Sequence, residues 1–348
     1  MVSRFCWEGK TRIMRDQAIA VVIALYNGGE FIADALDSVA AQTSQPASVI
    51  VVDDGSSDNG PAIVEGIART RDITLVRKEH GGQSSARNVG ISHATTPLIA
   101  LLDQDDIWYP HHLEQLAVPF RDDRIPKPGW AYSNLDQIDR EGRMLATNVL
   151  DNFVDVEHPK RTLSGCLKTD MYILPSASLI NHAAFEDVGG FDENLIGYED
   201  DDLFLRMHMR HYENVYIDSA TSKWRVYPNS ASHSIQMAQS RMVFFRKWLA
   251  ILGNQAGVEK QYINTCLAPR LFRVALSNYH HALRKGDRCA QAIAVETMKL
   301  LLPFVPERIA VPARLILPLS SILGTAPIAR IAARTAPLAR FAYNLIAR

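Results

Sequence analysis

The sequence lacks an apolar run long enough to cross a membrane. A spanning helix needs roughly 20 consecutive apolar residues, and the nearest candidate, between Arg314 and Arg330, is interrupted by Pro318 and Pro327. No apolar stretch precedes Ala18, which argues against a secretory signal peptide. We therefore expect a cytoplasmic protein that contacts the inner face of a membrane only peripherally, if it does so.

Cysteine and net charge are also scarce. The four cysteines, Cys6, Cys166, Cys266 and Cys289, are widely spaced in 348 residues. This spacing matches no zinc or redox motif, and four thiols are too few for a disulfide scaffold. The formal net charge of -1 leaves no basic footprint for nucleic acid. The hydrophobic fraction of 47% is ample for a large core.

Several familiar catalytic motifs are missing. The chain has no Walker A loop, no G-x-G-x-x-G fingerprint and no G-x-S-x-G elbow, so nothing indicates a P-loop enzyme, a dinucleotide enzyme or a nucleophile elbow. The paired histidines His111 and His112 have no zinc partner at a usable spacing. We expect both to lie on a helix surface.

The N-terminal half instead shows regular strand–helix alternation. Continuous apolar runs predict strands that are buried on both faces, as in parallel sheets, and apolar residues at helical spacing separate them. This alternation, with short loops, predicts an α/β protein with a mostly parallel central sheet. The predicted strands cover residues 18–27, 48–53, 73–79 and 97–103, and the predicted helices cover 30–43, 61–70 and 84–95.

Polar residues stand where three of these strands end. They are Tyr26-Asn27, Asp53-Asp54, and the group from Asp103 to Asp106. In open α/β sheets, ligands bind at the carboxyl ends of the strands, so we expect one shared site. A carboxylate at Asp54 could accept hydrogen bonds from a base or a ribose, although "DDGSSD" is also typical of a simple turn.

Asp103, Asp105 and Asp106 place three carboxylates within four positions. Ile107 and Trp108 follow where an EF-hand loop would need a ligand and a glycine, so a calcium loop of that kind is excluded. Asp105 or Asp106 could cap a helix beginning near Pro110, but three aspartates exceed what a cap needs. The group suits Mg²⁺ or Mn²⁺ completed by a substrate diphosphate.

A third acidic group, Glu199-Asp200-Asp201-Asp202, precedes a helical pattern. Solvated charge at a helix N-terminus would account for one or two of these acids, because the helix dipole favours anions there. A general base would account for another. The stretch from 126 to 229 is otherwise less regular, with a predicted hairpin turn at "DREG".

Taken together, these segments resemble the family 2 glycosyltransferases, which have the GT-A fold. The resemblance runs from about Ala18 to Asn229. It rests on five segments in order, each weak by itself: "VVIALYNGGEFIADALDSVAAQT", "VIVVDDGSSD", "GGQSSARNVGISHA", "PLIALLDQDDIWYP" and "GGFDENLIGYEDDDLFLRM". The resemblance implies an inverting sugar transfer from a nucleotide-diphosphate donor.

The family motifs imply roles for individual residues. Asp54 would contact the nucleobase. Asp103-Gln104-Asp105 matches the D-x-D motif, in which Asp105 would bind Mg²⁺ or Mn²⁺ and Asp103 would contact the ribose or a metal-bound water. Asp200, in the Glu-Asp motif, would be the catalytic base. The nucleotide-sugar-binding residues implied in this way are Ala24, Tyr26, Asn27, Asp54, Arg87, Asp103, Gln104 and Glu199, and the metal ligands are Asp105 and Asp103.

One position departs from the family pattern. Many relatives carry a histidine in an R-x-H-P-x-S segment after the acidic helix, whereas Tyr227 stands there in this chain. A histidine ligand is therefore in doubt, although Tyr227 could hydrogen-bond a phosphate. The region from Ser164 to Ser178 is expected to border the acceptor.

The C-terminal region lies outside the family resemblance and reads as helical. Residues 300–348 contain six arginines, no lysine and one acid, Glu307. A basic amphipathic pattern of this kind suits the surface of an anionic membrane, and we favour this over packing on the domain or a homodimer contact. Its apolar face would comprise Ile328, Ile331, Leu338, Phe341 and Leu345.

We therefore expect a lead-in at 1–17, a GT-A catalytic domain at 18–234 and a helical extension at 235–348. The expected partners are a nucleotide-diphosphate sugar and a glycan or lipid-linked acceptor in cell-surface polysaccharide assembly, with no nucleic acid. A sugar-phosphate nucleotidyltransferase is one alternative, but "YNGGE" is a poor version of the glycine-rich phosphate loop it would need. A non-catalytic nucleotide-sugar-binding protein is the other.

Overall fold

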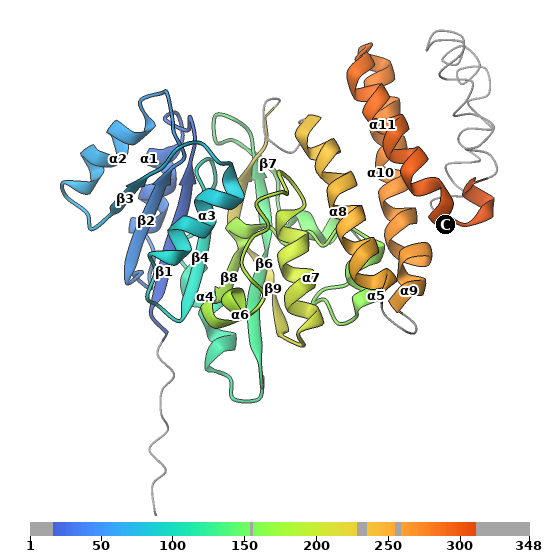
Figure 1. Ribbon diagram of the computed structural model, residues 1–348. Helices are drawn as coiled ribbons and strands as arrows, with labels where there is room; N and C mark the ends of the chain where they lie inside the picture. Colours follow the sequence, from blue (N-terminus) through green and yellow to red (C-terminus); the bar gives the residue numbers. More distant parts are fainter. Residues whose placement is uncertain (1–16, 154–155, 228–234, 255–258, 311–348) are drawn as a thin grey trace, which may run out of the picture.

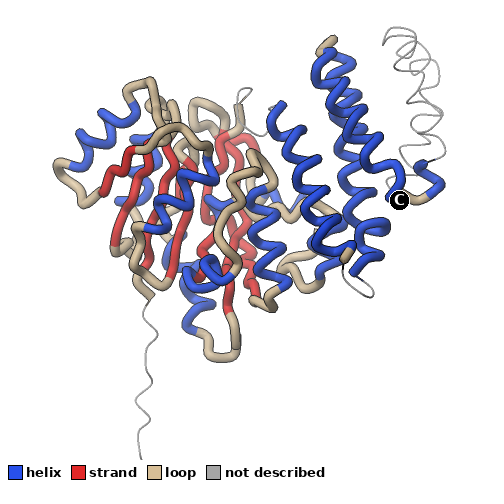
Figure 2. The backbone as a smooth tube through the Cα atoms, in the orientation of Figure 1, coloured by secondary structure: helices blue, strands red, loops and turns tan. Residues whose placement is uncertain are grey.

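The structure is a computed structural model that describes residues 17–153, 156–227, 235–254 and 259–310. A central sheet runs through one part of the molecule, and a group of long helices stands beside its later strands (Figure 1). Figure 2 shows the strands as one layer with helices around it. The confirmed fold class is α/β with a helical C-terminal region.

The first half of the sheet is parallel, with strand order β3-β2-β1-β4. Alternate residues of β1 enter two separate cores: Val21 packs with α1 and α4 on one face, and Val22 with α3 on the other. Burial on both faces explains the continuous apolar runs. The elements of this half are β1 (Ile19–Leu25), α1 (Ile32–Ala40), β2 (Ser48–Asp53), α2 (Gly60–Ala68), β3 (Thr74–Arg77), α3 (Gln83–Ser92) and β4 (Leu98–Asp103).

The second half of the sheet continues in the order β8-β6-β9-β5 and mixes directions. β8 is antiparallel to both β4 and β6, while β6 and β9 are parallel. The predicted hairpin is confirmed, since β6 pairs with β7 and Gly142 adopts a positive φ of 82° in its turn. The elements are β5 (Ile107–Trp108), α4 (His112–Ala117), β6 (Pro128–Ile138), β7 (Met144–Ala146), α5 (Leu163–Lys168), β8 (Ser178–Asn181), α6 (His182–Asp187), α7 (Glu199–Met209) and β9 (Glu213–Arg225).

The C-terminal helices pack directly on the sheet-bearing part. Trp248 of α8 and Leu271 of α10 are fully buried in the same core as Phe204 of α7 and Ile180 of β8. A one-turn π-helix at Ile263–Leu267 precedes α10. The helices of this region are α8 (Ile235–Gly253), α9 (Glu259–Tyr262), α10 (Ala268–Lys285) and α11 (Arg288–Leu301).

Two sequence predictions concern segments that lie largely or wholly outside the described residues. These are the lead-in at 1–17 and the amphipathic face that includes Ile328 and Phe341. The domain boundary at residue 234 stays a prediction. Among the helices of the described ranges, none combines the length and apolarity that a membrane crossing requires.

Candidate active site

The carboxyl ends of β1, β2 and β4 meet at one edge of the sheet. In register, Leu25 of β1 lies beside Asp53 of β2, and Ala24 lies beside Asp103 of β4. A cavity of about 1130 Å³ opens at this edge. It is lined by every site residue predicted from the sequence: Ala24, Tyr26, Asn27, Asp54, Arg87, Asp103, Gln104, Asp105, Glu199 and Asp200.

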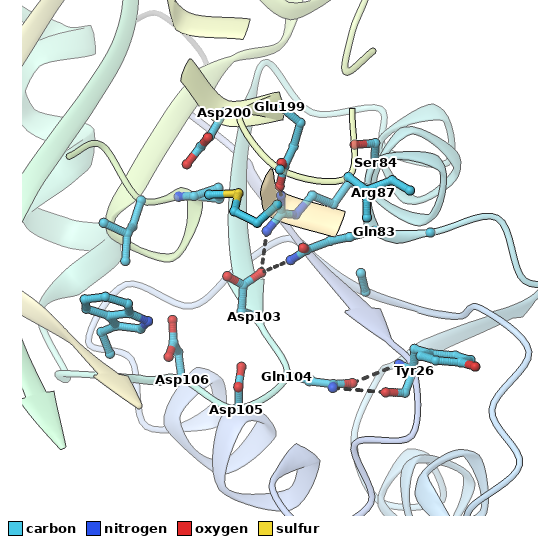
Figure 3. Close-up of a pocket in the computed structure, with 18 of the residues that line it drawn as sticks. Tyr26, Gln83, Ser84, Arg87, Asp103, Gln104, Asp105, Asp106, Glu199 and Asp200 are labelled. Carbon is cyan, nitrogen blue, oxygen red and sulfur yellow. Dashed lines mark hydrogen bonds and ion pairs between the residues drawn. The ribbon is translucent and has the colours of Figure 1, made fainter. Parts of the chain in front are cut away.

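Gln104 fastens the loop after β1 to the loop after β4. Its side-chain amide accepts a hydrogen bond from the Tyr26 N–H at 2.8 Å and donates one to the Tyr26 carbonyl at 3.1 Å (Figure 3). A side chain at Gly28 would collide with this amide. Gln104 therefore positions this wall of the cavity by binding the backbone of Tyr26.

Asn27 fastens the same loop to the segment after β2. It adopts a positive φ of 49°, a conformation that asparagine tolerates better than most residues. Its N–H donates to Ser56 Oγ at 3.0 Å, and its Oδ1 accepts from the Ser57 N–H at 2.8 Å. The side chain of Asn27 is therefore used to order the loop.

Asp54 is buried and its carboxylate has several donors. Oδ1 accepts from Lys78 Nζ at 2.6 Å and from the Gly81 N–H at 2.9 Å, while Oδ2 accepts from the Gly82 N–H at 2.8 Å. His80 Nδ1 lies 2.9 Å from Oδ2 and stacks on the exposed Tyr26 ring at 4.1 Å. These contacts hold the loop before α3 against β2.

Arg87 joins the two acidic motifs across the cavity floor. Its guanidinium is 2% exposed and lies 2.5 Å from Asp103 Oδ1 and 3.1 Å from Glu199 Oε1 (Figure 3). Gln83 also donates to Asp103 Oδ1 at 2.9 Å. Burial raises the pKa of the Glu199 carboxyl, and the Arg87 guanidinium opposes that rise.

The Asp105 carboxylate contacts Tyr227, the residue that departs from the family pattern. The Tyr227 hydroxyl donates to Asp105 Oδ2 at 2.9 Å. Burial raises the pKa of the Asp105 carboxyl, and the nearby Asp103 carboxylate raises it further. Tyr227 thus reaches the expected metal ligand itself.

Asp106 does not cap a helix, so that interpretation is wrong. α4 begins only at His112, after β5. Asp106 is 2% exposed, and its Oδ1 accepts from the Arg225 N–H at 2.9 Å. Arg225 Nε also donates to the Asp105 carbonyl at 2.8 Å. Arg225, the first residue of the segment in which Tyr227 replaces the histidine, holds the acidic loop against the end of β9.

The four acids at the start of α7 are not a solvated patch. Asp201 forms an ion pair with the buried Arg270 of α10. Asp202 is fully buried and accepts from Arg206 Nε at 2.8 Å and Lys247 Nζ at 2.9 Å. Sequence reasoning missed Arg270, whose signal is an arginine within the apolar stretch 266–272.

Asp200 is different from its three neighbours. Its Oδ1 accepts from the Asp201 N–H at 2.8 Å, and within the described ranges no basic side chain forms an ion pair with it. Burial raises the pKa of the Asp200 carboxyl well above its usual value, with further contributions from the Glu199 and Asp201 carboxylates. A half-buried carboxylate with a raised pKa suits a general base.

The carboxylates of Asp103 and Asp105 fit a divalent cation that also binds substrate. Their mutual repulsion contributes to the raised pKa of Asp105, and a cation would relieve it. In the part of the chain that the structure describes, no group of three or more His, Cys, Asp or Glu side chains forms a complete metal site. Two carboxylates plus a diphosphate are the ligand set that Mg²⁺ commonly uses.

A family model and individual known sequences both match this chain, and both describe glycosyltransferases. Residues 20–189 match the family model described as Glycosyl transferase family 2. An uncharacterized glycosyltransferase of Rickettsia felis is 30% identical over 190 residues, which cover 54% of this chain and 31% of the relative. The chain therefore spans about a third of the length of that relative.

Two solved structures resemble the whole arrangement. Residues 1–349 of Staphylococcus aureus TarS, in complex with UDP-GlcNAc, give a TM-score of 0.62 at 20% identity and cover 84% of this chain and 82% of that one. A mannosyltransferase from Pyrobaculum calidifontis, in complex with GDP-Man and Mn²⁺, gives a TM-score of 0.54 at 18% identity. The match covers 92% of this chain and 80% of that one. At these identities the likeness establishes the fold, GT-A.

Proposed function

We propose that this chain, whose residues 20–189 match the model of glycosyltransferase family 2, is an inverting enzyme that transfers a sugar from a nucleotide-diphosphate donor to an acceptor hydroxyl. One observation carries the proposal. Asp200 lines the cavity without an ion-pair partner among the described residues, while Glu199, Asp201 and Asp202 each have one.

The proposed reaction exchanges one bond at the anomeric carbon for another. The acceptor oxygen forms a bond to the anomeric carbon as the bond to the donor's phosphate oxygen breaks. The carboxylate of Asp200 takes the proton of the acceptor hydroxyl, which is the usual contribution of a positioned base. The electron pair of the broken bond leaves with the nucleoside diphosphate.

The donor would lie over the ends of β1, β2 and β4. Asp54, Tyr26 and Asn27 would border the nucleoside, as the family motifs imply. Because both oxygens of Asp54 already have donors, a base that bonds to it must replace or share one of them, and His80, a partly exposed partner, is the candidate for replacement. The UDP-GlcNAc and GDP-Man named for the two similar structures support a nucleotide sugar as the class of donor.

Asp105 and Asp103 would hold a Mg²⁺ or Mn²⁺ ion together with the donor diphosphate. Such an ion supplies stabilisation of negative charge on the leaving phosphate. The chain's own contribution is to fix the two carboxylates, Asp103 through Arg87 and Gln83, and Asp105 through Tyr227. The Mn²⁺ of the similar mannosyltransferase structure supports this proposal.

The loop at residues 26–29 argues against a sugar-phosphate nucleotidyltransferase. That activity would need free backbone N–H groups to cradle phosphates. Here the N–H groups of Tyr26, Asn27 and Gly29 already donate to side chains of Gln104, Ser56 and Asp58. Polysaccharide assembly, a lipid-linked acceptor and a homodimer remain predictions from the sequence.

The test is a hydrolysis screen of UDP- and GDP-sugars with and without Mn²⁺. We expect one donor to be hydrolysed slowly in a metal-dependent manner. Asp105→Asn should weaken Mn²⁺-dependent binding of the matching nucleoside diphosphate by at least tenfold in calorimetry, whereas Asp72→Asn, on an exposed loop, should bind normally. Turnover of nucleoside triphosphates with sugar phosphates, in place of nucleotide sugars, would overturn the proposal.

A further inference from the structure

The expected donor residues share this cavity with a group of aromatic side chains. These are Phe153, Tyr172 and Trp224, and we call the three the aromatic wing. Pockets for single small molecules commonly span about 300–1,000 Å³, and this cavity measures about 1130 Å³. It is therefore larger than the pocket that one small molecule usually occupies.

The rings of the aromatic wing are supported by contacts with one another and with a small apolar core. The Phe153 and Tyr172 rings stack with centroids 4.0 Å apart and an interplanar angle of 20°. Phe153 and Trp224 pack on a small core formed by Leu135, Val149 and Ala177, which is separate from the two main cores. All three aromatic side chains are only half-buried, so part of each ring surface stays accessible.

The backbone at Tyr172 is itself unusual. Tyr172 has a positive φ of 52°, which is rare for a bulky residue. Its neighbours Met171 and Ile173 are 0% and 2% exposed, so they anchor the chain on both sides. Conformations of this kind persist where the surroundings enforce them, and they cluster at ligand sites.

A buried arginine connects the wing to the proposed base. Arg270 Nε donates to Asp170 Oδ1 at 3.0 Å, and Arg270 also pairs with Asp201, which is next to Asp200 in α7. The Asp170 side chain is 40% exposed and lines the cavity two residues from Tyr172. Tyr172 of the aromatic wing and the partly exposed Asp170 carboxylate therefore belong to one segment, which Arg270 ties to α7.

This combination matches the chemistry of a sugar ring. One face of a sugar ring presents C–H groups, which are attracted to the negative face of an aromatic ring, and its hydroxyls can donate to a carboxylate. An alkyl chain has no hydroxyl to donate to this carboxylate, whose Oδ1 already accepts from Arg270. We propose that the aromatic wing is the acceptor subsite and that it binds a saccharide ring against the stacked pair of Tyr172 and Phe153. The inference rests on the proposed function, since it identifies the class of acceptor for the same site.

The test measures binding of three methyl glycosides by saturation-transfer NMR, with the full chain loaded with UDP or GDP and the diamagnetic ion Mg²⁺. The probes are methyl β-glucoside, methyl β-galactoside and methyl N-acetyl-β-glucosaminide, and dodecyl phosphate is the lipid probe. We expect at least one glycoside to bind through its C–H face. Tyr172→Ala should weaken that binding about tenfold or more, and Tyr172→Phe should retain it, because a ring is what the site requires.

Two controls make the result specific. Leu145→Ala, at a side chain that is 57% exposed on β7 and does not line the cavity, should bind the glycoside normally. Phe153→Ala tests the wing without changing the strained residue, and thermal melting verifies that each variant is folded. Weaker binding in both wing variants, with Leu145→Ala unchanged, supports the proposal.

Three results would overturn the saccharide subsite: no glycoside binds the native chain, the wing variants bind as the native chain does, or only dodecyl phosphate binds in a Tyr172-dependent way. None of these depends on whether a donor is hydrolysed. Failure of the donor screen with glycoside binding intact would instead remove the proposed function and leave a saccharide-binding site.

Discussion

Four consecutive acids begin α7, and their partners separate their roles. Glu199 pairs with Arg87, Asp201 with Arg270, and Asp202 with Arg206 and Lys247. The remaining acid, Asp200, has no such partner among the described residues, and burial raises the pKa of its carboxyl. Acids that look equivalent in the sequence therefore differ in the charges that surround them.

Replacing Asp200 by Asn should remove the base while preserving the shape of the side chain. We expect transfer to the acceptor to fall by about 10²–10⁴-fold, the usual contribution of general base catalysis. Calorimetric binding of the donor nucleotide should stay within about threefold, because no donor contact is assigned to this carboxylate. Normal turnover in Asp200→Asn, with Asp72→Asn as the matched control, would show that another group takes the proton.

The raised pKa of Asp200 gives a direction for the pH dependence. The base acts only when it is unprotonated, so kcat should rise with pH and level off above the pKa of this carboxyl. Since burial and two neighbouring carboxylates raise that pKa, the rise should occur above the ordinary carboxyl value of about 3.9. Transfer rates measured from pH 4 to 8 at saturating donor test this, and a rate already constant at pH 5 contradicts it.

Sequence reasoning found the residues of the site but not how they contact one another. The expected residues all line one cavity because strand ends of a parallel sheet share an edge. Arg87 bridges Asp103 and Glu199 through side-chain packing, and its contact with Glu199 joins residues 112 positions apart along the chain. His112 was expected on a surface but is fully buried, where it stacks on Trp108 and bonds Thr221.

At the scale of elements, α10 provides a positive counter-charge for α7, a helix that is distant from it in the sequence. Arg270 is 2% exposed and neutralises Asp201 and Asp170. The predicted strands and helices of the N-terminal half agree with the structure, because burial on both faces and helical spacing are local signals. The antiparallel placement of β8 beside β4 was not predicted, since four-residue strands carry little pattern.

Arg270→Met should leave two carboxylates near the base without their cation. Breaking a buried pair on one side costs about 3–5 kcal/mol, so urea unfolding should show a loss of that order in the free energy of unfolding. The exposed Arg69→Met is the control and should change it by less than about 0.5 kcal/mol. A loss below about 1 kcal/mol in Arg270→Met would mean that water or rearrangement supplies the missing compensation.

At the scale of the molecule, the sheet-bearing part and the C-terminal helices share one core. Phe244, Phe245 and Trp248 of α8 are 0% exposed and pack with residues of α7. Periodicity in the sequence predicts that these helices exist, but it does not say which surface they cover. That surface is set by the shapes and charges of distant side chains, such as Lys247 beside Asp202.

The membrane prediction concerns the segment beyond the described residues. Residues 325–348 carry four arginines, and each basic residue near an anionic surface contributes about 1 kcal/mol to binding. Truncation after Gly324 should therefore reduce sedimentation with phosphatidylserine liposomes more than tenfold, and neutral liposomes serve as the control. Equal binding by both chains would exclude this segment as a membrane contact.

The distribution of counter-charges around α7 has a consequence for recombination between relatives. The cation for Glu199 comes from α3, that for Asp201 from α10, and Lys247 for Asp202 from α8. A chimera that joined this catalytic half to a foreign C-terminal half would lose Arg270 and Lys247 at once, while Arg87 and Arg206 would stay. Halves of two relatives should therefore be interchangeable only when the incoming C-terminal half has an arginine and a lysine at the positions of Arg270 and Lys247.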